Sequence, residues 1–140
     1  MKILAAVDGS PYTKRMLAYL AAHDEWLGAH HAYTLLHAVP AVPPRAAAAL
    51  DKDTLKSYYD DEAEKVFKPI RSFFNKQGLK ADFVGKPGSA AELIAATAEK
   101  GRFDLVILGS HGHGSLTNLV MGSVATKVLA RCRTPVLLVR

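Results

Sequence analysis

Residues 105–112, LVILGSHG, decide the fold, because an unbroken apolar run passes directly into a turn marked by two glycines. After a gap of nine residues, Gly122 and Ser123 begin a helical pattern. A continuously apolar run is typical of a strand that is buried on both faces of a parallel sheet. The segment therefore predicts a strand over Leu105–Leu108, a loop over Gly109–Met121 and a helix that starts near Ser123.

The rest of the chain repeats this rhythm of short apolar runs and helical stretches, which is typical of a parallel sheet covered by helices. Further strands are predicted at Ile3–Val7, Tyr33–Val39, Leu79–Val84 and Pro135–Val139. Further helices are predicted at Pro11–Leu27, Asp51–Gln77 and Ser89–Lys100, with Ser10 as an N-cap, a capping box from Ser89 to Glu92, a kink or break near Pro69 and a surface loop over Pro40–Leu50. The 140 residues fit one domain, residues 1–140.

The positive charge of the chain is spread along the sequence. The net charge is +5, yet no basic run is longer than Lys14-Arg15. Nucleic-acid-binding domains gather their basic residues on one face or along one helix. The pattern favours solubility and one local anion site over a DNA or RNA surface.

Cysteine content and hydropathy predict a cytoplasmic protein. A lone cysteine, Cys132, cannot form an internal disulfide and is expected to be a structural thiol, which agrees with a reducing compartment. The apolar run at the start stops at Asp8, which is too short for the core of a signal peptide. Nothing approaches the roughly 20 apolar residues that a membrane span requires.

The glycines of residues 109–123 indicate an anion-binding turn. Gly109 stands at the carboxyl end of a buried strand, the edge where open parallel sheets bind ligands. Glycine lets the backbone approach a ligand closely, and Gly112 offers the same freedom one turn later. Gly122 and Ser123 open a helix, where unpaired backbone N–H groups and the helix dipole stabilise a phosphate. The alternative is a plain strand–loop–helix joint in which the glycines only form turns.

Two other nucleotide-binding motifs are absent from the sequence. No G-x-x-x-x-G-K-[ST] occurs, which excludes a P-loop NTPase. After Gly112 and Gly114, no third glycine follows at the spacing of a dinucleotide-binding turn.

The motifs resemble those of the universal stress protein family, in its small, single-domain, ATP-binding branch. The family pattern G-x-x-G, nine residues, G-[ST] is complete at Gly109, Gly112, Gly122 and Ser123. Flanking matches are ILAAVDGS at 3–10, TLLHAV at 34–39, DLVILGSHG at 104–112, GSVATKVL at 122–129 and TPVLLVR at 134–140. The resemblance implies an α/β fold of the adenine nucleotide alpha-hydrolase-like type, with five parallel strands in the order 3-2-1-4-5 and helices on both faces. It also implies a site for ATP, or for AMP or ADP, with or without Mg²⁺, across the tips of strands one and four.

The resemblance also implies roles for individual residues. Asp8 is expected on the adenine and ribose side, and the backbone of Val39 is expected to help hold the adenine. The ribose and first phosphate should be lined by Leu108 and Gly109, and the phosphates should be contacted by Gly112, Gly122, Ser123 and Val124. Many relatives carry Arg or Lys after the second glycine. This chain has His113 there, and near pH 7 a neutral imidazole attracts phosphate less than a fixed cation does.

Several residues have both a chemical and a structural interpretation. Asp8 is expected to be a ribose or Mg²⁺ partner rather than only a turn residue. His111 is expected to contact phosphate, and neither it nor the pair His30-His31 is expected to form a metal site. His37, inside a predicted strand, is expected to be a hydrogen-bonded core residue.

These observations predict an adenine-nucleotide-binding protein of stress response or signalling rather than an efficient catalyst. Phosphoryl transfer needs a metal anchor and a group that orients the attacking water. The predicted loop Gly109–Met121 contains no carboxylate for the second role. A slow ATPase, or an enzyme that transfers nucleotidyl or phosphoryl groups, is the second hypothesis. A structural dimer with an unoccupied pocket is the third.

The last strand predicts a homodimer. In the order 3-2-1-4-5 it lies at an edge of the sheet, and Val136–Val139 carries no charge. An uncovered apolar edge invites pairing with another strand. A second copy of the chain would cover it symmetrically.

Overall fold

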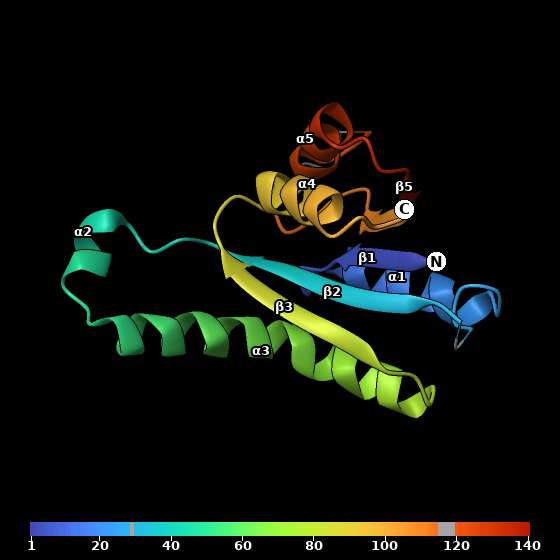
Figure 1. The fold of residues 1–140 in the computed structure, drawn as a ribbon, viewed down its shortest axis with the longest axis horizontal. Helices are drawn as coiled ribbons and strands as arrows, with labels where there is room; N and C mark the ends of the chain where they lie inside the picture. Colours follow the sequence, from blue (N-terminus) through green and yellow to red (C-terminus); the bar gives the residue numbers. More distant parts are fainter. Residues whose placement is uncertain (29, 115–119) are drawn as a thin grey trace.

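The predicted α/β architecture is confirmed by the computed structural model, which describes residues 1–28, 30–114 and 120–140 (Figure 1). One parallel sheet has the order β3-β2-β1-β4-β5. Its strands are β1 Lys2–Ala6, β2 Ala32–Val39, β3 Ala81–Pro87, β4 Leu105–Gly109 and β5 Val136–Val139. The helices are α1 Pro11–Ala22, α2 Pro44–Ala48, α3 Lys52–Lys76, α4 Ala90–Lys100 and α5 Ser123–Arg131. Residues 115–119 of the predicted loop lie outside the described residues.

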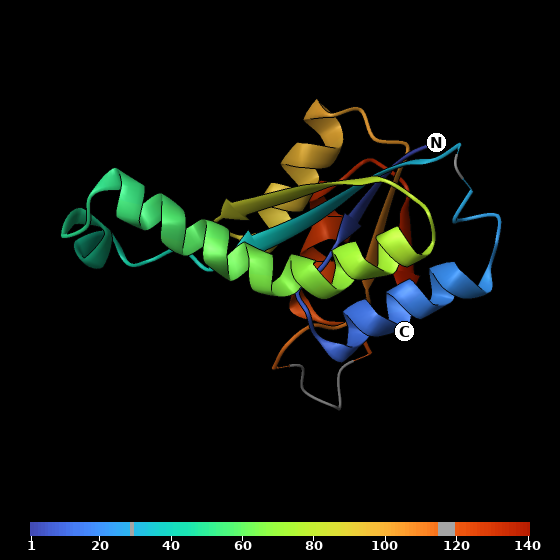
Figure 2. The same cartoon turned by 90° about the horizontal axis from the view of Figure 1, so that it is seen from below.

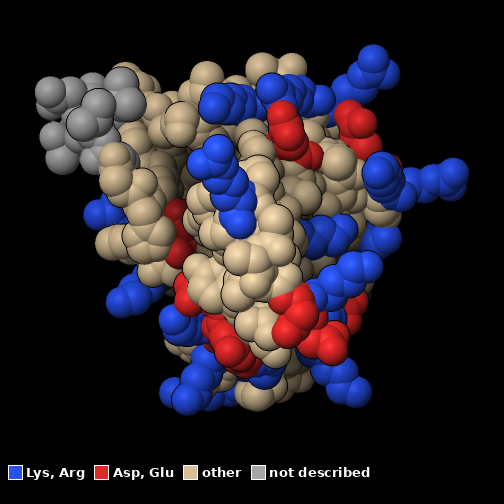
Figure 3. Space-filling model, turned by 90° about the vertical axis from the view of Figure 1, so that its left-hand side faces the viewer, with Lys and Arg blue, Asp and Glu red and all other residues tan. Residues whose placement is uncertain are grey.

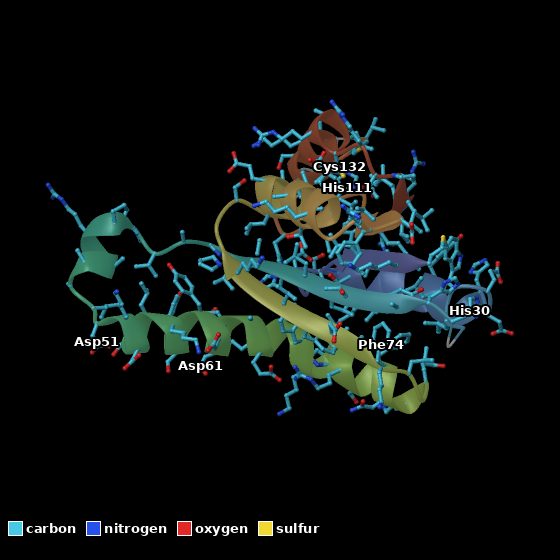
Figure 4. All side chains as sticks on the ribbon, viewed as in Figure 1. His30, Asp51, Asp61, Phe74, His111 and Cys132 are labelled. Carbon is cyan, nitrogen blue, oxygen red and sulfur yellow. The ribbon has the colours of Figure 1, made fainter. Side chains whose placement is uncertain are left out.

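The helices cover both faces of the sheet, with α1 and α3 on one side and α4 and α5 on the other (Figures 1 and 2). Successive residues of β1 point to opposite faces. Ile3 and Ala5 therefore join the core under α1 and α3, whereas Leu4 joins the core under α4 and α5. Phe74, only 1% exposed, reaches from α3 toward the sheet (Figure 4).

The order of the strands fixes where a ligand can bind. From β1 the chain moves to β2 on one side, and it later returns to β4 on the other side. Both neighbours run parallel to β1, so the carboxyl ends of all three strands share one edge. The reversal of strand order between β1 and β4 opens a crevice at that edge.

Three predicted elements differ from the structure. The third strand, predicted at Leu79–Val84, spans Ala81–Pro87. The first helix ends at Ala22 instead of Leu27, because the His23 ring hydrogen-bonds to the Tyr19 carbonyl and the chain turns at Trp26. The surface loop Pro40–Leu50 contains the short helix α2, which starts at a proline pair that suits a first helical turn.

The long helix α3 runs unbroken through Pro69, so the predicted break does not occur. Proline removes the hydrogen bond to the carbonyl four residues earlier. Here that carbonyl belongs to Lys65, and Lys65 and Pro69 are both exposed, so water can solvate it. The predicted ends of this helix, Asp51 and Gln77, are its N-cap and C-cap residues in the structure.

Ser10 and Ser89 occupy N-cap positions as predicted, but neither side chain makes a capping hydrogen bond with the described part of the chain. The capping box at Ser89 is therefore wrong. Within the same residues, no helix combines the length and the apolar character that crossing a membrane requires.

Candidate functional site

A cavity of about 440 Å³ opens at the carboxyl edge of the sheet, among the tips of β1, β2 and β4 and the start of α5. Figure 3 looks onto this edge and shows the surface hollowed there. Its inner wall is mostly apolar and consists of Ala6, Leu36, Ala38, Ala90, Ile94, Leu108 and Ala125. Its polar residues include Asp8, Thr13, Ser123 and three histidines. An apolar cavity of this size with a few convergent polar groups is typical of a small-molecule site.

Every residue predicted for the site lines this cavity except Val39. Val39 is 2% exposed, and its carbonyl accepts a hydrogen bond from the Gly88 N–H on the β3 side. Its neighbour Ala38 lines the cavity instead. Backbone groups in a parallel ladder alternate between the two neighbouring strands.

The backbone of Ala38 is therefore directed toward the cavity. The Leu36 carbonyl accepts from the Val7 N–H of the β1 side, so Ala38, two residues later, faces the same side. The pairing of β1 with β2 stops at Leu36. The N–H and C=O of Ala38 are thus a donor and an acceptor beyond the tip of β1. Sequence reasoning missed Ala38 because the strand register was not known.

The Asp8 carboxyl is held in place by α1. Its Oδ1 accepts hydrogen bonds from the Ser10 N–H at 2.9 Å and from the Thr13 hydroxyl at 3.0 Å. Burial alone would raise the pKa of Asp8, but hydrogen bonds from Ser10 and Thr13 and the nearby His113 outweigh it, and the pKa lies below its ordinary value. Asp8 is therefore an oriented, ionised carboxylate at neutral pH. Thr13 also lines the cavity and was missed, because its role depends on the turn of α1.

Three glycines of the motif are places where the chain is too close for a side chain. A Cβ on Gly109 would lie 2.7 Å from the Cβ of Tyr12, and one on Gly112 would lie 2.6 Å from Asp8 Oδ2. A Cβ on Gly122 would lie 3.1 Å from the Ser110 carbonyl oxygen. The glycines therefore bring β4, α1 and α5 together around the cavity.

The start of α5 supplies backbone donors at the cavity. The Gly122 N–H, expected to be unpaired, instead donates to the Ser110 carbonyl at 2.6 Å. The first intrahelical bond of α5 runs from Thr126 to Gly122, and Gly122 has no side chain to cap the helix. Helix geometry leaves the N–H groups of Ser123, Val124 and Ala125 without partners inside the helix. These donors suit an anion.

Three histidines line the cavity. His37 is 9% exposed, and its Nδ1 donates to the Val7 carbonyl at 2.8 Å, so the expected hydrogen-bonded core role is confirmed. His113 donates from Nε2 to the Asp8 carbonyl at 2.6 Å. His111 Nδ1 lies 3.0 Å from the Ser110 hydroxyl.

An aromatic contact joins α1 to the loop that follows β4. The His111 ring lies 5.1 Å from the ring of Tyr12, a cavity residue that sequence reasoning missed. Figure 4 shows His30 well away from His111: His30 precedes β2, at the amino end of the sheet, whereas His111 follows β4, at the carboxyl end. Among the described residues, no group of three or more His, Cys, Asp or Glu side chains is arranged to hold a metal ion.

Comparisons with known proteins identify relatives over the whole chain. The model of the Universal stress protein family matches residues 1–140. The universal stress protein Rv2005c of Mycobacterium tuberculosis is 50% identical over 139 residues, which cover 99% of this chain and 45% of that protein. A universal stress protein of Thermus aquaticus is 33% identical and is covered to 97%, with 99% of this chain. The solved structure of MJ0577, described as a test case of structural genomics, has a TM-score of 0.79 and 28% identity over 99% of this chain and 94% of that one.

Proposed function

This chain belongs to the universal stress protein family, and we propose that it binds an adenine nucleotide in the cavity at the carboxyl edge of its sheet. The observation that carries this proposal is the cavity itself. An apolar wall suited to a base faces a helix start whose first N–H groups have no partners inside the helix and suit a phosphate. ATP, ADP and AMP share the adenosine and the first phosphate that these two parts address.

Solved proteins of the same fold support the choice of an adenine nucleotide. A universal stress protein family protein of Arabidopsis thaliana has AMP bound, and two further universal stress proteins are complexes with cAMP and with dAMP. Their TM-scores to this chain are 0.70, 0.62 and 0.66. Their identities, 14% to 18%, establish the shared fold and no more.

In this proposal each part of the cavity has one task. The backbone N–H and C=O of Ala38 form hydrogen bonds with the edge of the adenine, in place of the expected backbone of Val39. Asp8 accepts hydrogen bonds from the ribose hydroxyls. The first turn of α5, with Ser123 and Val124, binds phosphate. A Mg²⁺ ion would be held mostly by the phosphates of the ligand, with Asp8 as the one carboxylate among the described residues that line the cavity.

We infer a role in stress response or signalling, in the cytoplasm, rather than rapid catalysis. Binding would change what the protein offers to a partner, provided that the partner binds the loaded form more tightly. The single cysteine, Cys132, is free and fits a reducing compartment. Turnover of ATP that persists through repurification and is lost in Asp8→Ala would instead favour the slow-ATPase alternative.

The direct test is nucleotide release and calorimetry. Denatured protein should release an adenine nucleotide that chromatography identifies, and nucleotide-free protein should bind one in titration calorimetry. Ala90→Leu, which fills the apolar wall, should abolish binding, whereas the control Ala130→Leu, on the exposed side of α5, should bind like the parent. Absence of binding by the folded parent protein at millimolar nucleotide would refute the proposal.

We also propose that β5 pairs with the β5 of a second copy. β5 lies at the edge of the sheet, and Val136, Leu137 and Leu138 remain partly exposed. A two-fold axis beside β5 would continue the sheet into a dimer. Sedimentation velocity at micromolar concentration should show a dimer, and a monomer alone would contradict the proposal.

A further inference from the structure

We propose that the cavity selects adenosine monophosphates, which carry one or two negative charges, over ATP that is not chelated by a metal. This inference rests on the proposed function and resolves which nucleotide the site favours. It follows from the charges that the protein places around the cavity.

The described lining of the cavity lacks a fixed cation. The described residues that line the cavity include no Lys or Arg. Residues 109–126, GSHGHGSLTNLVMGSVAT, contain none either, so the whole connection from the tip of β4 to the second turn of α5 is free of fixed positive charge. The next basic residue, Lys127, is exposed on α5 and does not line the cavity.

The described lining of the cavity carries one carboxylate, that of Asp8. Asp8 contributes a carboxylate to the cavity, and its hydrogen bonds to Ser10 and Thr13 keep it ionised at neutral pH. Arg15 is not a lining residue, and its guanidinium lies 4.8 Å from the centre of the Tyr12 ring. The histidines apart, the described lining is therefore formally negative, which opposes each further phosphate on the ligand.

The start of α5 can neutralise only a small negative charge. A helix start acts as roughly half a positive charge. The N–H groups of the first turn of α5, which have no partners inside the helix, can satisfy the oxygens of one phosphate. The charge of a triphosphate far exceeds this, so its outer phosphates would need Mg²⁺ or a basic side chain, as phosphoryl-transfer sites supply.

The test compares ligands by titration calorimetry with the intact protein at neutral pH. With a chelator present, AMP should bind tighter than ATP by roughly tenfold or more, because like charges in a partly enclosed site repel strongly. Adding Mg²⁺ should restore much of the ATP affinity. High salt should reduce the difference in affinity between AMP and ATP, because screening weakens the repulsion between Asp8 and the phosphates.

A matched pair of variants tests the cause. His113→Lys adds a fixed cation at the cavity and should raise the affinity for chelator-treated ATP several-fold more than the affinity for AMP. His30→Lys adds the same charge at the opposite end of the sheet and should leave the ratio unchanged. Thermal melts establish that both variants are folded, and the salt dependence of the parent protein tests the same cause without a substitution.

The outcomes separate the two proposals. Two results would overturn the selection by charge while leaving nucleotide binding intact. One is metal-free ATP that binds as tightly as AMP. The other is a difference in affinity between AMP and ATP that changes neither with salt nor with His113→Lys. A folded protein that binds neither AMP nor adenosine nor ATP with Mg²⁺ would overturn the proposed function itself.

Discussion

Replacing Gly112 with alanine should destabilise the protein through Asp8. The new Cβ would lie 2.6 Å from Asp8 Oδ2, whereas ordinary contact begins near 3.4 Å, so the carboxyl must retreat by about 0.8 Å. A free side chain would do so at little cost. Asp8, however, is fixed through Oδ1 by Ser10 at 2.9 Å and Thr13 at 3.0 Å. The retreat should break one of these hydrogen bonds.

The expected loss is about 1 to 2 kcal/mol of unfolding free energy, the lower part of the range for a hydrogen bond to a charged group, because Asp8 is only partly buried. Urea unfolding at neutral pH measures it. With a slope of about 2 kcal/mol per molar urea, the middle of the usual range, the midpoint should fall by roughly 0.5–1 M.

A double-mutant cycle isolates the mechanism. In an Asp8→Ala background the same glycine substitution should cost almost nothing, because no carboxyl remains to be displaced. Gly78→Ala is the control, since Gly78 has a φ of +68° and open space around it, so its cost should be the same in both backgrounds. An equal cost for Gly112→Ala with and without Asp8 would refute the reasoning.

Three further substitutions or titrations test the fold. Phe74→Ala should cost about 3–5 kcal/mol in urea unfolding, because it empties a fully buried position, and a loss below about 1 kcal/mol would contradict its placement. Asp51→Ala should lower the thermal stability by removing the cap hydrogen bond that the Asp51 carboxylate accepts from the Thr54 N–H. Because hydrogen bonding lowers the pKa of Asp51, the difference in stability from the parent should be full at neutral pH and vanish as the pH falls through that pKa, below 3.8. A difference that does not depend on pH would exclude the cap. Burial raises the pKa of Tyr33 to about 12, so its phenol, which donates to the Trp26 carbonyl, should still be protonated when exposed tyrosines have ionised, and Tyr33→Phe should remove that last step from a spectrophotometric titration.

Most of the fold could be predicted from the sequence because buried strands and amphipathic helices leave strong patterns. β1 and β4 are short apolar runs that end at glycine-containing turns, and their predicted positions agree with the structure to within a residue. The end of α1 could not be predicted in this way. Leu27 continues the apolar pattern and does pack against the core, but it does so from a turn beyond the helix.

The site was predictable where it depends on glycine and less so where it depends on register. Gly109, Gly112 and Gly122 are visible in the sequence because few other residues permit such close approaches. The choice between Ala38 and Val39 depends on which neighbouring strand the backbone of each residue faces. Successive residues face opposite neighbours, and the sequence does not show which residue faces which strand until the partner strands are known. Tyr12 and Thr13 reach the cavity because α1 starts beside β4. No local sequence pattern indicates this tertiary arrangement.

The long helix α3 extends beyond the sheet (Figure 2). The helix therefore has two parts of unequal local stability. From Ala63 onward it buries a residue at nearly every turn, whereas Lys52–Tyr58 is almost entirely solvated and is anchored by its cap. Isolated helical turns are marginal in water. Amide protons of the overhang should therefore exchange with solvent orders of magnitude faster than those beyond Ala63, so that this end of the helix can fray and re-form while the sheet beneath it stays intact.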